Sequence, residues 1–478
     1  MSRDEARSLL SRMGEVLHLS IPAAASMLSY TLVGVVDTIM VGHLGANSLA
    51  AVGIANTVLF TIGAFVMGLL HAVSPLVAQN VGAGQHAEVG RVLHQGTWLS
   101  LVLGSIAGWA LFMGSDLLLG VLGQSPDVIT QGADYLGVRA LGLPLFYMAV
   151  TRDNFFEGLG DTRTPMVLNI VVNVVHLLLG LWFIPGGMGL APMGVMGAAV
   201  ATVLSHALGL VLAQLVLSSR HRREPRWEIL PTGGVSRIHL GRLLKVGWPM
   251  GVQFAMDIGS WAMMTLIMGS FGATALAASQ VAMRLINVTS MTGHGVGIAT
   301  TALVGRELGA GRKESARGYS IAGAMLAVAW AVMLSLVYLM APVFWVELFT
   351  REPAVVDLAV ALLLIGLLIQ ATDVLQMVLY GALRGAGDTR WPMYTSWVCC
   401  WLMGLPLAWF LAVYLNLGPR GIYAALAVEF LVMGVTFLHR VLGDRWLEQN
   451  LVETSTLNPD VPDGESVPAR LDTSPTPA

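Results

Sequence analysis

The chain has few charged residues and almost no cysteine, and each shortage excludes a class of protein. Only 12% of its 478 residues are charged, whereas ordinary soluble domains carry about 25%. A water-facing surface cannot be built from so few charges, so the composition excludes a soluble enzyme. The net charge of -3 provides no basic field, so no nucleic-acid partner is expected. The adjacent Cys399 and Cys400 cannot form a disulfide framework.

Sequence motifs of catalysis are missing as well. The chain contains no HExxH, GxSxG or P-loop pattern, which would supply zinc ligands, a nucleophile or a phosphate cradle. A membrane enzyme is therefore a weak alternative, and no cofactor is expected.

Long apolar runs are the dominant positive feature. Hydrophobic residues make up 55% of the chain, and the mean hydropathy is +0.71. A helix crosses the hydrocarbon core with about 20 apolar residues, whereas a membrane strand needs only about 10, alternating with polar ones. The sequence therefore predicts an all-α polytopic membrane protein with twelve spans, at 15–40, 48–75, 92–113, 128–150, 164–185, 194–217, 241–267, 275–302, 318–340, 355–381, 391–414 and 421–440.

An internal repeat relates the two halves of the chain. GDTRTPM at Gly160–Met166 recurs as GDTRWPM at Gly387–Met393, and VGAG at Val81–Gly84 recurs as LGAG at Leu308–Gly311, both at an offset of 227 in the numbering. Each half holds six spans, so the halves share one orientation, as in transporters with parallel repeats. The predicted division is an N-terminus (1–14), an N-terminal six-helix lobe (15–217), a linker (218–240), a C-terminal six-helix lobe (241–441) and a disordered tail (442–478).

The basic residues predict the orientation. With twelve spans, 22 of the 26 Lys and Arg residues fall on the side of the two termini. Loops rich in Lys and Arg stay in the cytoplasm. The sequence therefore predicts cytoplasmic termini in a multi-pass protein of a plasma membrane, of the bacterial inner-membrane type. The exceptions are Arg139 and Arg284 inside spans, and Arg351 and Arg420 in the opposite loops.

The chain resembles the MATE family of multidrug and toxin extrusion transporters, in its NorM-like branch. The resemblance rests on Pro22, on DTIMVGHLG at Asp37–Gly45, on the VGAG stretch and on the repeated GDTR-x-PM. It implies a V-shaped pair of six-helix lobes and a secondary active antiporter working by alternating access. Such a protein exports organic cations and amphipathic drugs in exchange for H⁺ or Na⁺. A monomer is expected.

Four acidic residues fall inside predicted spans. A charge at the bilayer centre costs about 3 to 10 kcal/mol, so such residues are functional candidates. None of the four is part of the repeated scaffold, because different residue types stand at the equivalent positions of the other half. These acids and their counterparts are Asp37 with Met264, Asp257 with Tyr30, Asp373 with Phe146, and Glu429 with Thr202.

Two other acids, Asp161 and Asp388, do repeat. They lie in charged loops, where turn and capping roles beside Arg163 and Arg390 are expected.

In the N-terminal lobe, the resemblance implies a cation site made by Asp37 with Asn169 and Asn173. The two asparagines are four apart, so both amides project from one helix face. The alternative is that they only join helices as polar contacts. Thr202 is a weaker candidate for this site.

In the C-terminal lobe, the resemblance implies a cation site at Asp257 and Asp373. Gln253 lies one turn before Asp257, and Gln376 lies three residues after Asp373, so each pair shares a helix face. Na⁺ could bind at Asp257, Asp373 or Asp37, and H⁺ is the alternative coupling ion. A structural carboxylate is the other interpretation of each acid.

The sequence leaves two possible roles open for several polar residues inside the spans. Glu429 either faces the lobe interior or pairs with Arg284. Four histidines fall in spans and are either proton relays or core and interfacial residues: His71, His176, His206 and His294.

The main rival function is a flippase for lipid-linked oligosaccharides, since related folds move such cargo. Its cavity should carry basic residues for a pyrophosphate, yet the spans hold only Arg139 and Arg284 against four acids. This balance favours cationic cargo. A passive channel is a further alternative, which the two-lobe repeat with unduplicated acids argues against.

Overall fold

The structure is a computed structural model that describes residues 3–121, 125–187, 189, 191–223, 234–449 and 451–452. The side chains of residues 3–8, 30–33, 35 and 223 lie outside this description. The described helices are α1 (Arg3–Gly42), α2 (Ala46–Leu70), α3 (Val73–Gly82), α4 (His86–Val121), α5 (Pro126–Leu141), α6 (Leu143–Gly158), α7 (Arg163–Phe183), α8 (Gly194–Arg223), α9 (Arg237–Gly269), α10 (Ala273–Gly309), α11 (Lys313–Met340), α12 (Pro342–Glu347), α13 (Pro353–Ala386), α14 (Arg390–Ser396), the π-helix η2 (Trp397–Gly404), α15 (Leu405–Trp409), the π-helix η3 (Phe410–Tyr414), α16 (Pro419–Leu442) and the 3₁₀-helix η4 (Arg445–Glu448).

Each of the twelve predicted spans coincides with a helix or a run of consecutive helical segments. The second span covers α2 and the start of α3, the fourth covers α5 and the first half of α6, and the eleventh runs from α14 to η3. Eight helical stretches of the described chain are long and apolar enough to cross a membrane: Ala46–Gly82, His86–Val121, Arg163–Phe183, Gly194–Arg222, Lys313–Met340, Pro353–Ala386, Arg390–Tyr414 and Pro419–Leu442.

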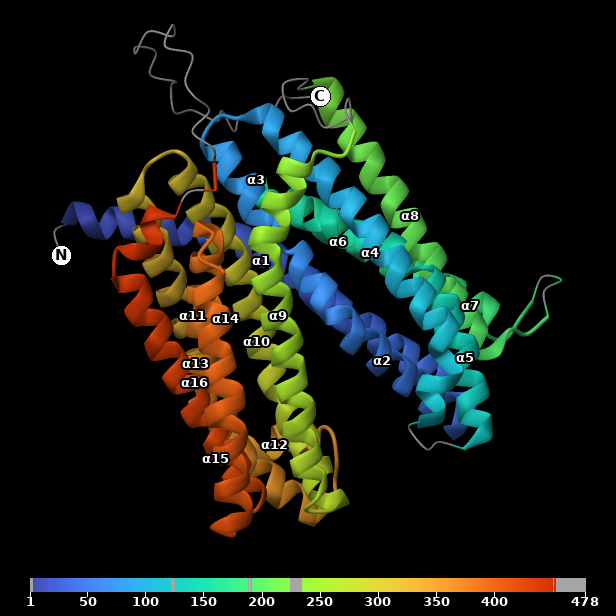
Figure 1. Cartoon of the computed structure of the whole chain (residues 1–478). Coiled ribbons are helices and arrows are strands. Elements are labelled where there is room, and N and C mark those ends of the chain that lie inside the picture. The colour runs from blue at the N-terminus through green and yellow to red at the C-terminus, as the bar shows by residue number, and fades with distance from the viewer. Residues whose placement is uncertain are drawn as a thin grey trace, which may run out of the picture.

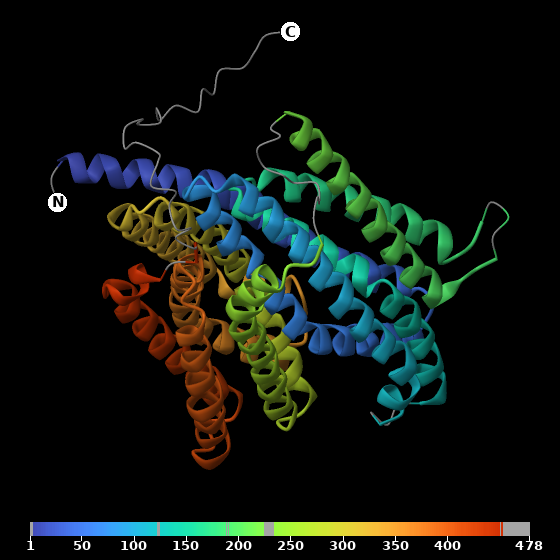
Figure 2. The same cartoon turned by 45° about the horizontal axis from the view of Figure 1, so that its top comes forward.

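The helices form two lobes that meet at one end and separate toward the other (Figures 1 and 2). The N-lobe consists of α1–α8, and the C-lobe consists of α9–α16 with η4. The start of α1 and the end of α16 both lie at the joined end, beside the start of α11. There Arg12 lies over the Tyr319 ring at 5.8 Å, and Arg317 donates to Asp444. The V shape and the placement of both helix ends on one side agree with the predicted architecture.

Glycines of the repeat let the lobes touch backbone to backbone. Gly68 on α2 faces α9, where an added Cβ would come within 2.6 Å of the Met250 carbonyl oxygen. Gly295 on α10, its counterpart in the repeat, faces α1, where an added Cβ would come within 2.9 Å of the Ser20 carbonyl oxygen. Small residues permit such close crossings of membrane helices. The repeat therefore produces a symmetric junction, α2 on α9 and α1 on α10.

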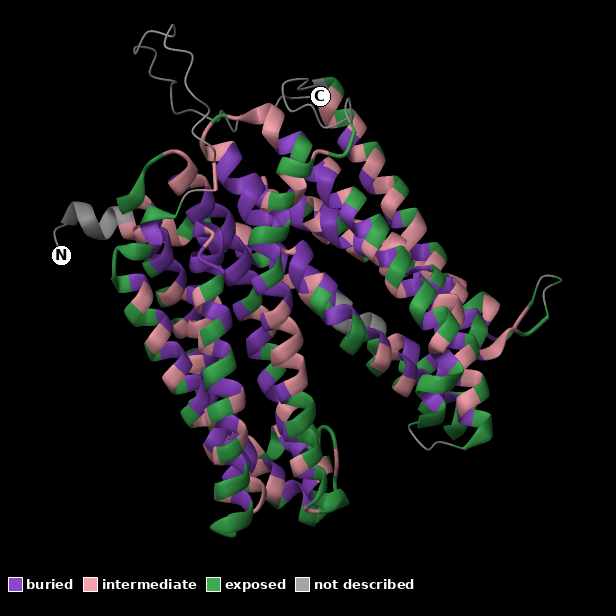
Figure 3. Ribbon diagram, viewed as in Figure 1, coloured by how far each residue is buried: buried purple, intermediate pink, exposed green. Residues whose placement is uncertain are grey.

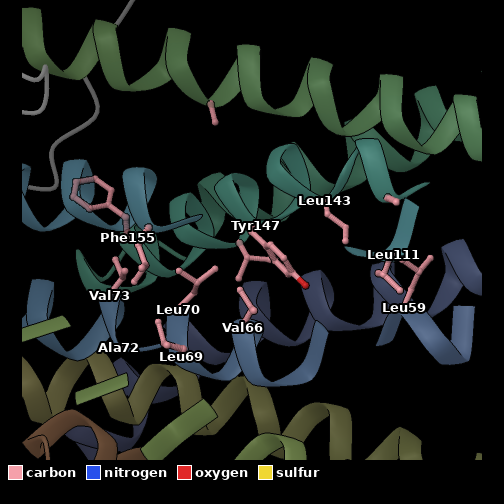
Figure 4. Packing of buried hydrophobic residues seen from close by; sticks show 14 of the residues in the cluster. Leu59, Val66, Leu69, Leu70, Ala72, Val73, Leu111, Leu143, Tyr147 and Phe155 are labelled. Atoms are coloured by element: carbon pink, nitrogen blue, oxygen red, sulfur yellow. The ribbon is translucent and has the colours of Figure 1, made fainter. Parts of the chain in front are cut away.

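The buried side chains are mostly apolar and are concentrated where helices meet (Figure 3). One cluster fills the N-lobe, and its members Leu70, Tyr147 and Phe155 are drawn in Figure 4. Large apolar residues also cover the outer faces, such as Trp109 at 69% exposed and Leu368 at 70% exposed. Water would not tolerate so much exposed apolar surface, whereas lipid does.

The first residues after α16 are ordered, so disorder from residue 442 onward is a wrong prediction for this stretch. Trp446 in η4 is fully buried in the C-lobe, and its indole nitrogen donates to the Val441 carbonyl oxygen at 2.8 Å. The Leu451 amide donates to Gln79 Oε1 at 2.9 Å. The rest of the predicted tail (453–478) and part of the predicted linker (224–233) lie outside the described residues.

Gln79 also joins the lobes directly. Its Nε2 donates to the carbonyl oxygens of Gly385 at 2.9 Å and Ala386 at 3.0 Å on α13. A residue of α3 therefore binds both the end of α13 and the segment after α16.

The two repeated acids lie in loops as expected, but each binds a different arginine from the one expected. Asp161 accepts the Thr164 amide at 3.0 Å, as a cap of α7, and pairs with Arg220 rather than with Arg163. Asp388 accepts both Nε and Nη2 of Arg440, at 2.8 and 2.7 Å, instead of pairing with Arg390. In both lobes the GDTR acid therefore binds an arginine of that lobe's last long helix.

Candidate functional site

In the N-lobe, α1 and α7 are joined by a row of polar contacts. Asn169 Nδ2 donates to Ser26 Oγ at 2.8 Å. One turn on, Asn173 Nδ2 donates to Ser29 Oγ at 2.9 Å and to its carbonyl oxygen at 3.0 Å. The predicted common face of the two amides is therefore present, and it faces α1. These bonds are the cross-helix contacts of the alternative interpretation, and they do not join either amide to Asp37.

Asp37 is instead bonded to His176, which lies further along the same face of α7. His176 Nε2 lies 2.6 Å from Asp37 Oδ1, and both residues are buried. His176 is thus the immediate partner of the N-lobe acid. The sequence offered a signal for this partner, because residues 169, 173 and 176 share one helix face.

Thr202 and Asn169 each form a further hydrogen bond within the N-lobe. The Thr202 hydroxyl donates to the Ala198 carbonyl oxygen at 2.9 Å, one turn back on α8. That bond stays inside one helix and does not join Thr202 to Asp37. Asn169 also donates to Asp153 Oδ2 at 3.3 Å on α6, a residue that the sequence analysis did not consider.

In the C-lobe, the eleventh span departs from the regular α-helix. Its segments η2 and η3 are π-helical, whereas the equivalent α7 is an unbroken α-helix. Pro406 lies in this span where α7 has Leu179. Because proline has no amide hydrogen, it removes a hydrogen bond from the preceding turn. Short π-helical segments inside α-helices occur often at functional sites.

The π-helical segment places Cys400 between two acids. Cys400 Sγ lies 4.0 Å from Asp257 Oδ1 on α9, and Cys400 also contacts Glu429 on α16. Glu429 is buried beside Gly404, where an added Cβ would overlap its Oε2. Asp257 and Glu429 are close enough to repel each other when both are charged.

Glu429 therefore faces the lobe interior, which decides between its two interpretations. In the part of the chain that the structure describes, it forms no ion pair with Arg284. Cys400 is the repeat counterpart of Asn173, so the repeat itself marked this position as a site candidate.

Asp373 has its own set of oxygen-bearing neighbours. Ser290 Oγ on α10 donates to Asp373 Oδ2 at 2.5 Å, and the Gln376 side chain also bonds the carboxylate. A carboxylate, a hydroxyl and an amide offer the oxygen ligands that hard cations prefer. Ser290 is a residue that the sequence analysis missed, because nothing in the pattern of α10 marks it.

Gln253 joins α9 to the eleventh span. Its Nε2 donates to Ser396 Oγ at 3.0 Å, while its buried Oε1 has no protein partner. Among the described side chains, Asp257 and Asp373 contact different neighbours, Cys400 for Asp257 and Ser290 for Asp373.

The histidines differ in their surroundings. His71 packs edge-on against Phe254 at 5.9 Å, and His206 packs against Phe146 at 5.4 Å between ring centres. Of the four, only His176 bonds a carboxylate within the described chain.

The family model of MatE matches the chain twice, at residues 22–182 and 249–410. The two matches begin at Pro22 and Pro249, which are equivalent positions of the internal repeat. The chain belongs to the MatE family. The predicted all-α fold with two repeated six-helix lobes is thereby confirmed, and the chain is a multi-pass membrane protein of a transporter family.

Two curated MatE relatives match almost the full chain. The probable multidrug resistance protein NorM of Bradyrhizobium diazoefficiens is 30% identical over 440 residues, covering 90% of this chain and 94% of that protein. The multidrug resistance protein PmpM of Pseudomonas aeruginosa is 30% identical over 427 residues, covering 87% and 88%.

Solved MATE structures share the fold. The eukaryotic MATE transporter AtDTX14 superimposes with a TM-score of 0.81 at 22% identity, covering 92% of this chain and 98% of that one. A mutant of the Vibrio cholerae MATE transporter VcmN gives 0.83 at 21% identity, covering 93% and 99%.

Proposed function

We propose that this MatE protein is a secondary active multidrug exporter, which exchanges organic cations or amphipathic drugs for H⁺ or Na⁺ by alternating access. One observation carries the proposal. The C-lobe holds Asp373 and Glu429 buried and Asp257 half-buried, without an ion pair to any Lys, Arg or His among the described residues. Carboxylates inside a lobe need a compensating charge or a proton.

A bound cation would supply the compensating charge that the described Lys, Arg and His side chains do not give these acids. H⁺, Na⁺ or a cationic drug could each neutralise them, and these partners would compete for the same charge. Competition for one site is what obligate exchange requires, because the drug leaves when the coupling ion arrives. Both curated relatives above are named as multidrug resistance proteins, which supports drugs as the cargo.

The proposed cation positions follow the contacts. Asp257 with Glu429 forms one position, and Asp373 with Gln376 forms a second one. Gln253 lines the first position with its free Oε1. In the N-lobe, Asp37 is the charged group, and Asn169, Asn173 and Thr202 are proposed to line the cavity around it.

The orientation is part of the proposal. Basic residues concentrate at the joined end of the lobes, where α1 begins and α16 ends. By the positive-inside rule this end is cytoplasmic, in a bacterial-type inner membrane. The lobes would then be open toward the outside. We propose a monomer, since each chain holds both lobes.

Transport in inverted membrane vesicles tests the function. With an acidified lumen, adding ethidium or norfloxacin without Na⁺ should release protons, reported by a pH-sensitive dye. Drug movement that requires a Na⁺ gradient and leaves the dye silent would identify Na⁺ as the coupling ion.

Single acid-to-amide variants connect the function to the site. Asp257→Asn, Asp373→Asn and Glu429→Gln should each reduce exchange more than tenfold at unchanged protein level. Asp116→Asn, an exposed acid of α4, is the matched control and should exchange normally. Full activity of all three variants would overturn the proposed site. No movement of any cationic drug by the wild type would overturn the function and favour a flippase.

A further inference from the structure

His176 gives the N-lobe acid a different partner from any acid of the C-lobe. Its Nε2 is 2.6 Å from Asp37 Oδ1, and its Nδ1 is buried without a protein partner. Nε2 is therefore the ring nitrogen that faces the carboxylate, and a hydrogen on Nε2 bonds Asp37 Oδ1 directly.

Nitrogen donors also occupy the neighbouring positions. The amide nitrogens of Asn169 and Asn173 both point at serines of α1. A metal cation requires oxygen lone pairs that face it, and an N–H that bonds a carboxylate oxygen competes for those lone pairs. Along this face of α7, the side chains direct nitrogen toward α1.

A guanidinium lies on the same side of the lobe. The Arg139 guanidinium is 5.9 Å from the centre of the Tyr135 ring. Tyr135 is fully buried and donates to Asn56 Oδ1 at 3.1 Å. His206 lies within electrostatic range of both Arg139 and His176. This permanent cation adds to the repulsion that a metal ion in this part of the lobe would meet.

We infer that His176 is the residue that excludes Na⁺ from Asp37. The imidazole holds Asp37 Oδ1 at 2.6 Å, so a metal ion at this carboxylate would have to share Oδ1 with an N–H donor or bind through Oδ2 alone. On this proposal that competition keeps Na⁺ from the N-lobe acid. The consequence for transport rests on the proposed function: if the protein is coupled to Na⁺, the Na⁺ would bind at the C-lobe acids. His176 is a specificity-determining residue in this sense.

Na⁺ binding to the purified full chain in detergent tests the inference without any transport assay. The melting temperature is followed while Na⁺ replaces K⁺ at constant ionic strength. The melting temperatures of the wild type and of Asp37→Asn should change with Na⁺ in the same way, because Asp37 does not bind Na⁺. If Asp37→Asn removes part of the wild-type Na⁺ response, the inference is overturned.

A histidine replacement should open the site. His176→Asn places a neutral amide oxygen near Asp37, and we expect the melting temperature of this variant to respond to a Na⁺ concentration at least tenfold lower than the wild type requires. The gain should disappear in the double variant with Asp37→Asn. His176→Gln is the second variant should the first misfold. His206→Asn is the matched control, because His206 does not bond Asp37 and its loss should bring no gain.

The outcomes separate this inference from the proposed function. No gain in either foldable His176 variant would overturn the role of His176, whatever the vesicles export. Conversely, absence of drug export would leave the Na⁺ result standing as a property of the N-lobe.

Discussion

The two lobes share a scaffold and differ in the partners of the acidic side chains inside their spans. Ser26 and Asn169 join the first and fifth spans of the N-lobe, and Gln253 and Ser396 join the equivalent spans of the C-lobe. The second pair stands at the repeat-equivalent positions of the first. The roles of donor and acceptor are exchanged, but the contact is kept.

Beyond this shared contact the lobes diverge. The N-lobe acid Asp37 has a base, His176, as its partner, whereas Asp373 in the C-lobe has a hydroxyl as donor. The position equivalent to His176 is Met403, which has no proton to give. The duplicated framework therefore holds one acid bonded to a histidine, Asp37, and three acids of the C-lobe with no ion pair to a basic side chain among the described residues. The proposed exclusion of Na⁺ from the N-lobe depends on this difference.

The largest expected effect is on the pH dependence of stability, and it concerns ionisable residues at equivalent positions of the two lobes. Glu157 near the end of α6 and Arg384 near the end of α13 are counterparts in the repeat. Burial, together with the nearby Asp153 carboxylate, raises the pKa of Glu157 to about 8, although the charge of Arg384 opposes this. Glu157 lies beyond the predicted span 128–150.

The sign of the pH effect follows from linkage. Folded Glu157 binds its proton more tightly than the unfolded chain does, so its contribution to stability is complete below about pH 4.5. That contribution is lost as pH rises toward 8, by at most about 1.4 kcal/mol per pH unit. Glu157→Gln should therefore flatten the melting temperature between pH 5 and 8, with Glu314→Gln, an exposed acid, as control. An unchanged pH profile would contradict the protonated state.

The next effect tests the symmetry of the lobe junction. Gly68→Leu and Gly295→Leu would each drive a side chain into the backbone of the opposite lobe, which should cost about 3 kcal/mol. Both variants should lower the melting temperature by similar amounts. Gly53→Leu on α2 meets open space and should change little. Strongly unequal losses of melting temperature in Gly68→Leu and Gly295→Leu would contradict a symmetric junction.

A smaller effect should be confined to the C-lobe. Gly404→Ala puts a methyl group where Glu429 Oε2 lies, and the carboxylate can move to relieve part of the overlap. We expect a loss of about 1 to 2 kcal/mol and a roughly tenfold drop in drug exchange. Gly53→Ala serves as control. Normal exchange by Gly404→Ala would mean that the position of Glu429 is unimportant.

The smallest effect compares the two repeated acids. Asp388 is 6% exposed in its side chain and binds Arg440 through two nitrogens, whereas the Asp161 side chain is 20% exposed. Asp388→Asn should cost about 1 to 2 kcal/mol and Asp161→Asn less, since hydrogen bonds to charged groups weaken with exposure. Chemical denaturation of both variants in detergent measures the order, and the reverse order would contradict it.

The sequence by itself determined the helices and their pairing into lobes. Apolar runs of sufficient length can only satisfy their backbone in lipid as helices, and the constant offset of the repeat located the shared turns. It also singled out the four acids inside spans, because charge within an apolar run is costly wherever the helix packs. Its assignment of disorder just after α16 was wrong, because the burial of Trp446 depends on a surface made by other helices.

Only the tertiary structure decided which groups meet each acid. His176 and Asp37 lie on α7 and α1, far apart in the chain, and Asp257, Cys400 and Glu429 come from three different spans. Helix periodicity fixes which face a residue occupies, but it carries no information about the rotation of that face toward a neighbour. The π-helical turns around Pro406 change that rotation locally. Packing therefore decided which side chain lies beside each carboxylate, an imidazole at Asp37 and a hydroxyl at Asp373.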